Sequence, residues 1–169
     1  MDLTPVADVL SLSVFLAFAL VALFGVFHPF MNIPFFILIG IAILILVSVG
    51  YVKDLIADPR PEGASNCGLF NEESHDSNGM PSAHMATLTF LLVVLVMFFP
   101  DKKLNKTILW VLAGLWLVAM GWARSYKHCH TLLQLLGGVG YGFTFVLGTL
   151  VALLVYIAVY AATCTRCVT

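Results

Sequence analysis

Residues 132–162 read LLQLLGGVGYGFTFVLGTLVALLVYIAVYAA, an apolar run without a single charged side chain. About 20 apolar residues carry a helix across a bilayer, so this run by itself indicates a membrane span. It is longer than one crossing needs, and we expect its helix to be tilted, kinked near its glycines, or extended past the lipid. The stretch places the chain among the membrane proteins.

The composition of the whole chain agrees with this assignment. Of its 169 residues, 61% are hydrophobic and only 10% are charged, which is too little polar surface to cover a soluble globule. Five stretches have the length and character of spans, approximately Val9–Phe27, Ile33–Val52, Ala83–Phe99, Thr107–Trp122 and Leu132–Ala162. The sequence therefore predicts an all-α, polytopic membrane helix bundle with about five transmembrane helices, in a single domain over residues 1–169.

The charges indicate how the chain is oriented. The first apolar stretch follows an acidic start, Asp2 and Asp8, and has no basic leader region, so we interpret it as a retained span. The chain has eight Lys and Arg residues, and at least three of them belong to the polar motifs described below. Most of the others, Lys102, Lys103, Lys106 and Arg166, lie in the 100–106 turn and at the C-terminus, against one acid, Asp101. Such residues favour the cytoplasmic side. We expect the C-terminus there, and the N-terminus with residues 53–82 and 123–131 on the exoplasmic side: the ER lumen in a eukaryotic or viral setting, the periplasm in a bacterial one.

Lys53 and Arg60 form the first of three polar motifs beside the spans, with the pattern K-x6-R-P. Pro59 and Pro61 flank Arg60 and force an extended path, so its guanidinium is aimed rather than left flexible. If the preceding helix continues to Asp58, Lys53 and Arg60 are about two turns apart on one side of it. The plainer alternative is a Lys and an Arg that snorkel to the interface at the end of a span.

Pro81-Ser82-Ala83-His84 is the second motif and opens the third apolar stretch. An Asn-Gly turn signal precedes it, and Pro81 suits the first position of a helix. We therefore expect Ser82, Ala83 and His84 to present backbone N–H groups at a helix N-terminus, where anions bind readily. The alternative is that Ser82 only caps the helix and that His84 is an interfacial histidine.

Arg124, His130 and Gln134 form the third motif, between the fourth and fifth apolar stretches. His130 and Gln134 are four residues apart on one helical face, where the amide can hydrogen-bond the imidazole and leave its other nitrogen free to attack. Each residue also has a plainer explanation: an anchoring Arg, a satisfied His and a helix-packing Gln. Three cationic or histidine-bearing motifs on one predicted side of the membrane nevertheless favour a shared site.

The three motifs in this order resemble those of the type 2 phosphatidic acid phosphatase superfamily, whose fold is shared with the vanadium haloperoxidases. Ala83 stands where that family usually has glycine, Ala123 where it has serine, and Gln134 where it has aspartate. The GMPSAH run at 79–84 and the Y-x3-H-T-x2-Q pattern at 126–134 are similar to the dolichyl-diphosphatase branch, in which glutamine is typical. The resemblance thus implies a polyprenyl diphosphate substrate.

The resemblance also implies roles for the motif residues. The phosphate-binding groups would be Lys53, Arg60, Ser82, Ala83 and Arg124, which stabilise the charge that develops on the phosphoryl oxygens. His130 would attack phosphorus to form a phosphohistidine, with Gln134 beside it, and His84 would protonate the departing oxygen. Neither a metal nor a cofactor is implied, and the partner would be a lipid phosphate or diphosphate in the membrane, not nucleic acid. A lipid monophosphatase acting on phosphatidic acid or a sphingoid phosphate, and an inactive scaffold derived from the family, remain alternatives.

Other features are less decisive. Cys67 and Cys129 share the predicted exoplasmic side and could form a disulfide in an oxidising compartment, whereas Cys164 and Cys167 suggest free thiols or reversible acylation. The loop at 62–80 carries the acids Glu62, Glu72, Glu73 and Asp76 and resembles a mobile lid. Glycines on the last two spans, Gly114, Gly121, Gly138 and Gly142, predict close helix packing within the subunit. The oligomeric state does not follow from the sequence.

Overall fold

The computed structural model describes residues 2–27, 32–64, 66–70, 77–98 and 105–165. Five helices run through this part of the chain: α1 (Thr4–Phe27), α2 (Asn32–Ile56), α3 (Ala83–Phe98), α4 (Lys106–Tyr126) and α5 (Leu132–Thr165). The predicted all-α bundle is therefore confirmed. Several residues named from the sequence lie outside the described ranges, namely Glu72, Glu73, Asp76, Phe99, Asp101, Lys102, Lys103, Arg166 and Cys167.

Four of the helices, α1, α2, α4 and α5, are long and apolar enough to cross a bilayer, which makes this an integral membrane protein. Helix α3 is equally apolar but has 16 residues, a length of about 24 Å. That is shorter than a hydrocarbon core of about 30 Å. The predicted number of helices is correct, while the third is shorter than an ordinary span.

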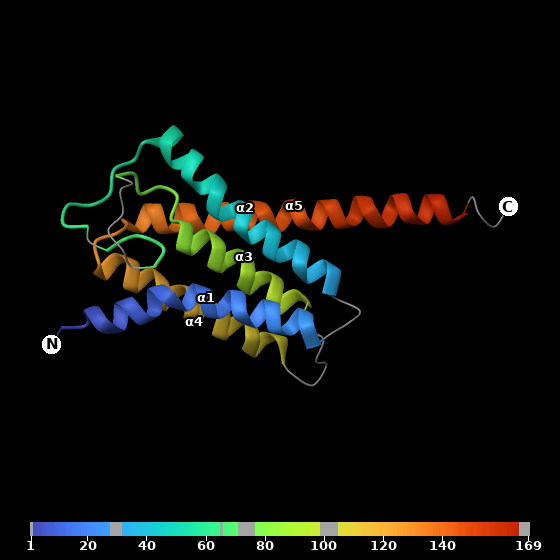
Figure 1. Ribbon diagram of the computed structural model, residues 1–169, viewed down its shortest axis with the longest axis horizontal. Helices are drawn as coiled ribbons and strands as arrows, with labels where there is room; N and C mark the ends of the chain where they lie inside the picture. The colour runs from blue at the N-terminus through green and yellow to red at the C-terminus, as the bar shows by residue number, and fades with distance from the viewer. Residues whose placement is uncertain (1, 28–31, 65, 71–76, 99–104, 166–169) are drawn as a thin grey trace.

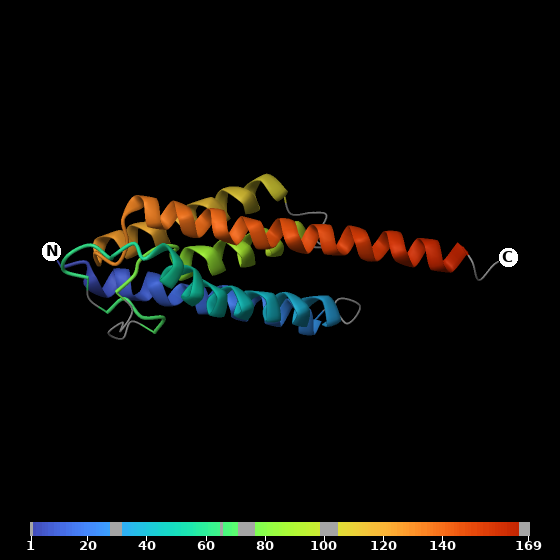
Figure 2. The ribbon, with the colours of Figure 1, turned by 90° about the horizontal axis from the view of Figure 1, so that it is seen from above.

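Helix α3 is the centre of the bundle. It contacts each of the other four helices, and it lies in the middle in both views (Figures 1 and 2). Every residue from His84 to Val94 is buried, as expected for a helix that is apolar all round. Because protein rather than lipid covers α3, its short length exposes little of it to the bilayer.

Glycines let α5 approach α3 closely. A Cβ atom at Gly138 would lie 2.6 Å from the carbonyl oxygen just before α3, and one at Gly142 would collide with the carbonyl oxygen of Ala86. Small residues of this kind allow membrane helices to pack backbone to backbone. The predicted packing is confirmed for these two glycines, whereas Gly114 faces open space and Gly121 makes only ordinary contacts.

The three motifs lie at one end of the bundle, together with the start of α1, and the last residues of α5 lie at the other (Figure 1). We call the end that carries the motifs the motif end; it comprises residues 53–64, 66–70, 77–84 and 123–134. Contacts between the chain's start and the end of α4 hold it together. The Leu3 N–H donates to the Tyr126 hydroxyl (3.2 Å), and the Lys127 ammonium pairs with Asp8 (2.8 Å).

Helix α5 continues well beyond the other four helices (Figures 1 and 2). It is one helix of 34 residues with no break at its glycines, so the kink considered for it is not found. Every residue from Val151 to Thr163 is exposed. The helix therefore has a packed first part and an unpacked second part.

Candidate active site

Lys53 and Arg60 reach the same cavity by different routes. Helix α2 ends two residues short of Asp58, and Ala57 adopts a left-handed φ of 52° that turns the chain. The next residues run extended, with the Arg60 N–H donating to the Ser77 carbonyl oxygen (2.9 Å). The turn and this short extended segment, not the helical spacing first expected, bring Arg60 near Lys53.

A cavity of about 210 Å³ opens at the motif end. Its lining includes five of the residues predicted from the motifs, namely Lys53, Arg60, Ala83, His84 and His130, together with loop residues 67–69. Lys53, His84 and His130 are each less than a tenth exposed. Residues from three segments far apart in the sequence therefore share one small polar space.

Ser82 lies just before α3. Its carbonyl oxygen accepts the first hydrogen bond of that helix, from the Ala86 N–H (3.0 Å). Pro81 is consequently outside the helix, not at its first position as predicted. The Ser82 N–H donates to the Gln134 carbonyl oxygen (3.2 Å), so this N–H is already used. A ligand at the helix start would meet the Ser82 hydroxyl and the first N–H groups of α3.

Buried polar atoms of the motifs that have no hydrogen-bond partner in the described part of the chain include Ser82 Oγ, His84 Nε2 and His130 Nδ1. The backbone of Leu69 hydrogen-bonds the His84 imidazole, so the ring is oriented while Nε2 stays unpaired. Buried polar groups in native proteins are nearly always paired. Such a set beside one cavity is what a polar ligand would complete.

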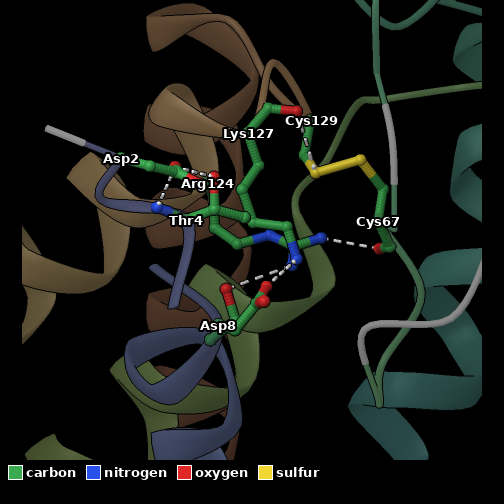
Figure 3. A network of polar contacts seen from close by, with 8 residues as sticks. Asp2, Thr4, Asp8, Cys67, Arg124, Lys127 and Cys129 are labelled. Atoms are coloured by element: carbon green, nitrogen blue, oxygen red, sulfur yellow. Dashed lines mark hydrogen bonds and ion pairs between the residues drawn. A yellow bond between two sulfur atoms is a disulfide. The ribbon is translucent and has the colours of Figure 1, made fainter. Parts of the chain in front are cut away.

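Arg124 is fully buried and lies beside the cavity rather than in its lining. Its Nη2 donates to the Cys67 carbonyl oxygen (2.6 Å), as Figure 3 shows, and its Nη1 to the Ser11 hydroxyl (3.4 Å). A buried cation of this kind is held in place by its hydrogen bonds. Its field acts on the neighbouring imidazoles, as described below for His130.

Cys67 and Cys129 form a disulfide, with Cα atoms 5.5 Å apart. The pairing considered from the sequence is therefore present. It joins the 66–70 loop to the turn before His130, and it lies beside Arg124 (Figure 3). Arg60 Nη1 donates to the Cys129 carbonyl oxygen (3.2 Å).

His130 lies between α4 and α5, outside both helices. Burial lowers its pKa well below the usual value, and the charges of Arg124, Arg60 and Lys53 lower it further, while the Gln134 side chain acts weakly in the opposite direction. A lowered pKa keeps the imidazole neutral at neutral pH. The ring then has a free lone pair, as a nucleophile requires.

Gln134 makes contacts beyond the one predicted. Its Oε1 accepts from the N–H of the residue that follows His130 (3.1 Å), and its Nε2 donates to the Asp58 carboxylate and to the Pro59 carbonyl oxygen, both at 2.8 Å. The Gln134 side chain also hydrogen-bonds His130, as predicted, and this bond acts to raise the His130 pKa. Its other contacts hold the turn that carries Arg60.

Helix α1 contributes residues that no motif indicated. Ser11 accepts from Arg124, and Asp8 pairs with Lys127, whose side chain is only 3% exposed. A signal was present in the sequence, because Asp8 and Ser11 are three residues apart and share one face of an otherwise apolar helix. Polar residues within a span usually face the protein interior.

The acidic loop considered as a lid is described only in part, at 62–64, 66–70 and 77–80. Its acids Glu72, Glu73 and Asp76 lie outside the described residues, so the lid stays a prediction. In the part of the chain that the structure describes, no group of three or more His, Cys, Asp or Glu residues is placed to hold a metal ion.

The family model of the PAP2 superfamily matches residues 33–164. The match covers all three motifs and most of the chain, and this chain belongs to the PAP2 superfamily. Members of this superfamily are phosphatases, so the protein falls among the phosphoric-ester hydrolases in general. No curated protein and no solved structure matches the chain. Helix α1, whose Ser11 and Asp8 contact Arg124 and Lys127, lies outside the matched residues.

Proposed function

We propose that this protein hydrolyses a polyprenyl diphosphate, without a metal, at the cavity of the motif end. The observation that carries the proposal is the gathering of Lys53, Arg60, His84 and His130 around one cavity of about 210 Å³, with Arg124 buried beside it. Cations and imidazoles together suit phosphoryl transfer. A phosphate head group can enter such a cavity while its lipid tail stays in the bilayer.

The reaction begins with His130. Its neutral imidazole attacks phosphorus, a P–N bond forms, and the P–O bond to the leaving group breaks. His84 gives a proton to the departing oxygen, which leaves as the prenyl monophosphate. Water then attacks the phosphohistidine with His84 as base, and inorganic phosphate and neutral His130 are released.

Positive charge at fixed positions supplies the stabilisation. Lys53, Arg60 and Arg124 surround the place where negative charge grows on the phosphoryl oxygens, and the loss of one such group typically costs a hundredfold to a thousandfold in rate. The Ser82 hydroxyl and the Ala83 N–H at the start of α3 add donors at a helix N-terminus. The polyprenyl assignment is supported by the resemblance of 79–84 and 126–134 to the dolichyl-diphosphatase branch.

The motif end is proposed to be exoplasmic. The Cys67–Cys129 disulfide supports this side, because disulfides persist in oxidising compartments,. Asn105 begins an N-x-T glycosylation sequence at the opposite end of α4, so it should stay unmodified in a eukaryotic host. A glycosidase-sensitive mass shift that Asn105→Gln removes would show the inverse orientation.

The decisive assay measures phosphate release by the purified protein in detergent with excess EDTA. The panel contains a polyprenyl diphosphate, phosphatidic acid and a sphingoid phosphate, and we expect the highest kcat/KM with the diphosphate. A preference for the monophosphates would make the protein a lipid monophosphatase, and no release from any lipid would make it an inactive scaffold. Activity lost in EDTA and restored by magnesium would refute the metal-independent mechanism.

A further inference from the structure

Each cysteine of the Cys67–Cys129 cystine accepts a hydrogen bond from an arginine at its carbonyl oxygen. Arg124 Nη2 donates to the Cys67 carbonyl oxygen at 2.6 Å, and Arg60 Nη1 donates to the Cys129 carbonyl oxygen at 3.2 Å. The two arginines come from different segments, one from the turn after α2 and one from α4. The disulfide is thus the covalent link between the two carbonyls that receive them.

Burial makes these contacts strong constraints. Cys129 and Arg124 are fully buried and Cys67 is 5% exposed, so water cannot easily replace a lost hydrogen bond. A bond from a charged donor in such surroundings contributes more than a neutral one at a surface. The other hydrogen bond described for the Arg124 guanidinium, to Ser11, is longer at 3.4 Å.

We propose that the Cys67–Cys129 cystine positions Arg60 and Arg124 for phosphate binding. A guanidinium has five N–H donors, so each arginine can give one to a cystine carbonyl and keep others for phosphoryl oxygens. Cys67 also lines the cavity itself, which puts its carbonyl beside the expected ligand. The cystine is a positioning element rather than a catalytic group, and this inference rests on the proposed function.

The test compares Cys67→Ala/Cys129→Ala with the parent protein. We expect kcat/KM per folded molecule to fall about tenfold to a hundredfold, since a misplacement of about 1 Å at an active site costs on the order of a hundredfold. The Kd for inorganic phosphate should rise by about the same factor. Cys164→Ala/Cys167→Ala, which removes two cysteines near the C-terminus, is the matched control and should change neither quantity.

A cystine that only stabilised the fold would give a different result. Its removal would lower Tm while kcat/KM per folded molecule and the phosphate Kd stayed at the parent values, and this outcome would overturn the inference. Phosphate binding needs no turnover, so it tests the positioning role separately from the lipid substrate. If phosphate binding depends on the cystine but the protein hydrolyses no lipid, only the proposed function is refuted.

A mutant cycle asks whether the cystine acts through the two arginines. In an Arg60→Ala/Arg124→Ala background, removing the cystine should change the Kd for inorganic phosphate by less than about threefold, because both groups that it positions are already gone. The full tenfold to hundredfold change in that background would overturn the inference. If Cys67→Ala/Cys129→Ala does not fold, Cys67→Ser/Cys129→Ser, which removes the disulfide with almost no change of side-chain volume, gives the same comparison.

Discussion

The two ends of the molecule differ in what they bury and what they expose. The motif end encloses Lys53, Arg124 and two histidines in a chain with few charges, whereas the far part of α5 exposes apolar side chains from Val151 onward. Apolar side chains that face lipid carry no desolvation cost, but buried charges do unless they are well paired. The groups that are costly to bury are thus concentrated at the motif end. Substitutions at the two ends should therefore differ in their effects on activity and stability.

The largest effect is expected at His130. His130→Ala should abolish turnover, because no phosphohistidine can form, and labelled substrate should leave no phosphate on the variant. The matched change at the far end is Tyr156→Ala, which should keep the parent rate because this side chain is 65% exposed. Near-normal phosphate release by His130→Ala would point to another nucleophile.

The two arginines should separate activity from stability. Arg60→Ala and Arg124→Ala should each lower kcat/KM about a hundredfold or more. Arg124→Ala should also lower the free energy of unfolding by about 1–3 kcal/mol, since it leaves the buried Cys67 carbonyl without its donor,. Arg60 is partly exposed, and its loss should change Tm less. Equal Tm losses would contradict this distinction.

The pH profile should report the charge gathered at the motif end. His130 acts as a nucleophile only when neutral, and its pKa lies well below 6.5 because of burial and the nearby cations. The acid limb of the kcat/KM profile should therefore fall below pH 6.5. Lys53→Met removes one of those cations, so it should raise the His130 pKa and move the acid limb upward. An acid limb that stays in place would mean another group controls it.

The smallest effect is expected on the exposed part of α5. Leu154 is 66% exposed, and Leu154→Ala should change the free energy of unfolding by less than about 0.5 kcal/mol,. Leu135 on the same helix is 5% exposed and belongs to the core, so Leu135→Ala should cost about 2–5 kcal/mol. Comparable losses in detergent unfolding would mean that α5 is covered along its whole length.

The helices could be predicted from the sequence because lipid demands long apolar runs. The gathering of the motifs on one side followed because two spans separate residues 53–82 from residues 123–131. The end of α2 could not be predicted, since a left-handed Ala57 gives no compositional signal. The contacts of Gln134 were also out of reach. Its partner Asp58 is 76 residues away, and only the folded turn brings the two together. Local spacing indicated only the contact with His130, four residues earlier.

The cystine and Ser11 show two further limits. That Cys67 and Cys129 lie on one side followed from topology, but their pairing required the distance between them, which the sequence does not contain. Ser11 lies outside every motif and 113 residues from Arg124. A polar face on α1 could have indicated an inward contact, while its partner depended on how α1 and α4 cross.

The length of α5 sets the depth at which the protein rests in the membrane. Its 34 residues span about 51 Å, and holding them inside a hydrocarbon core of about 30 Å would need a tilt of more than about 50°, beyond the usual range for membrane helices. One end of α5 must therefore enter the headgroup layer. The Tyr156 and Tyr160 rings stack 6.3 Å apart, about 36 and 42 Å from the helix start, and such rings prefer that layer. Bilayers of different thickness would then be accommodated by the unpacked part of α5, and the distances around His130 would stay the same.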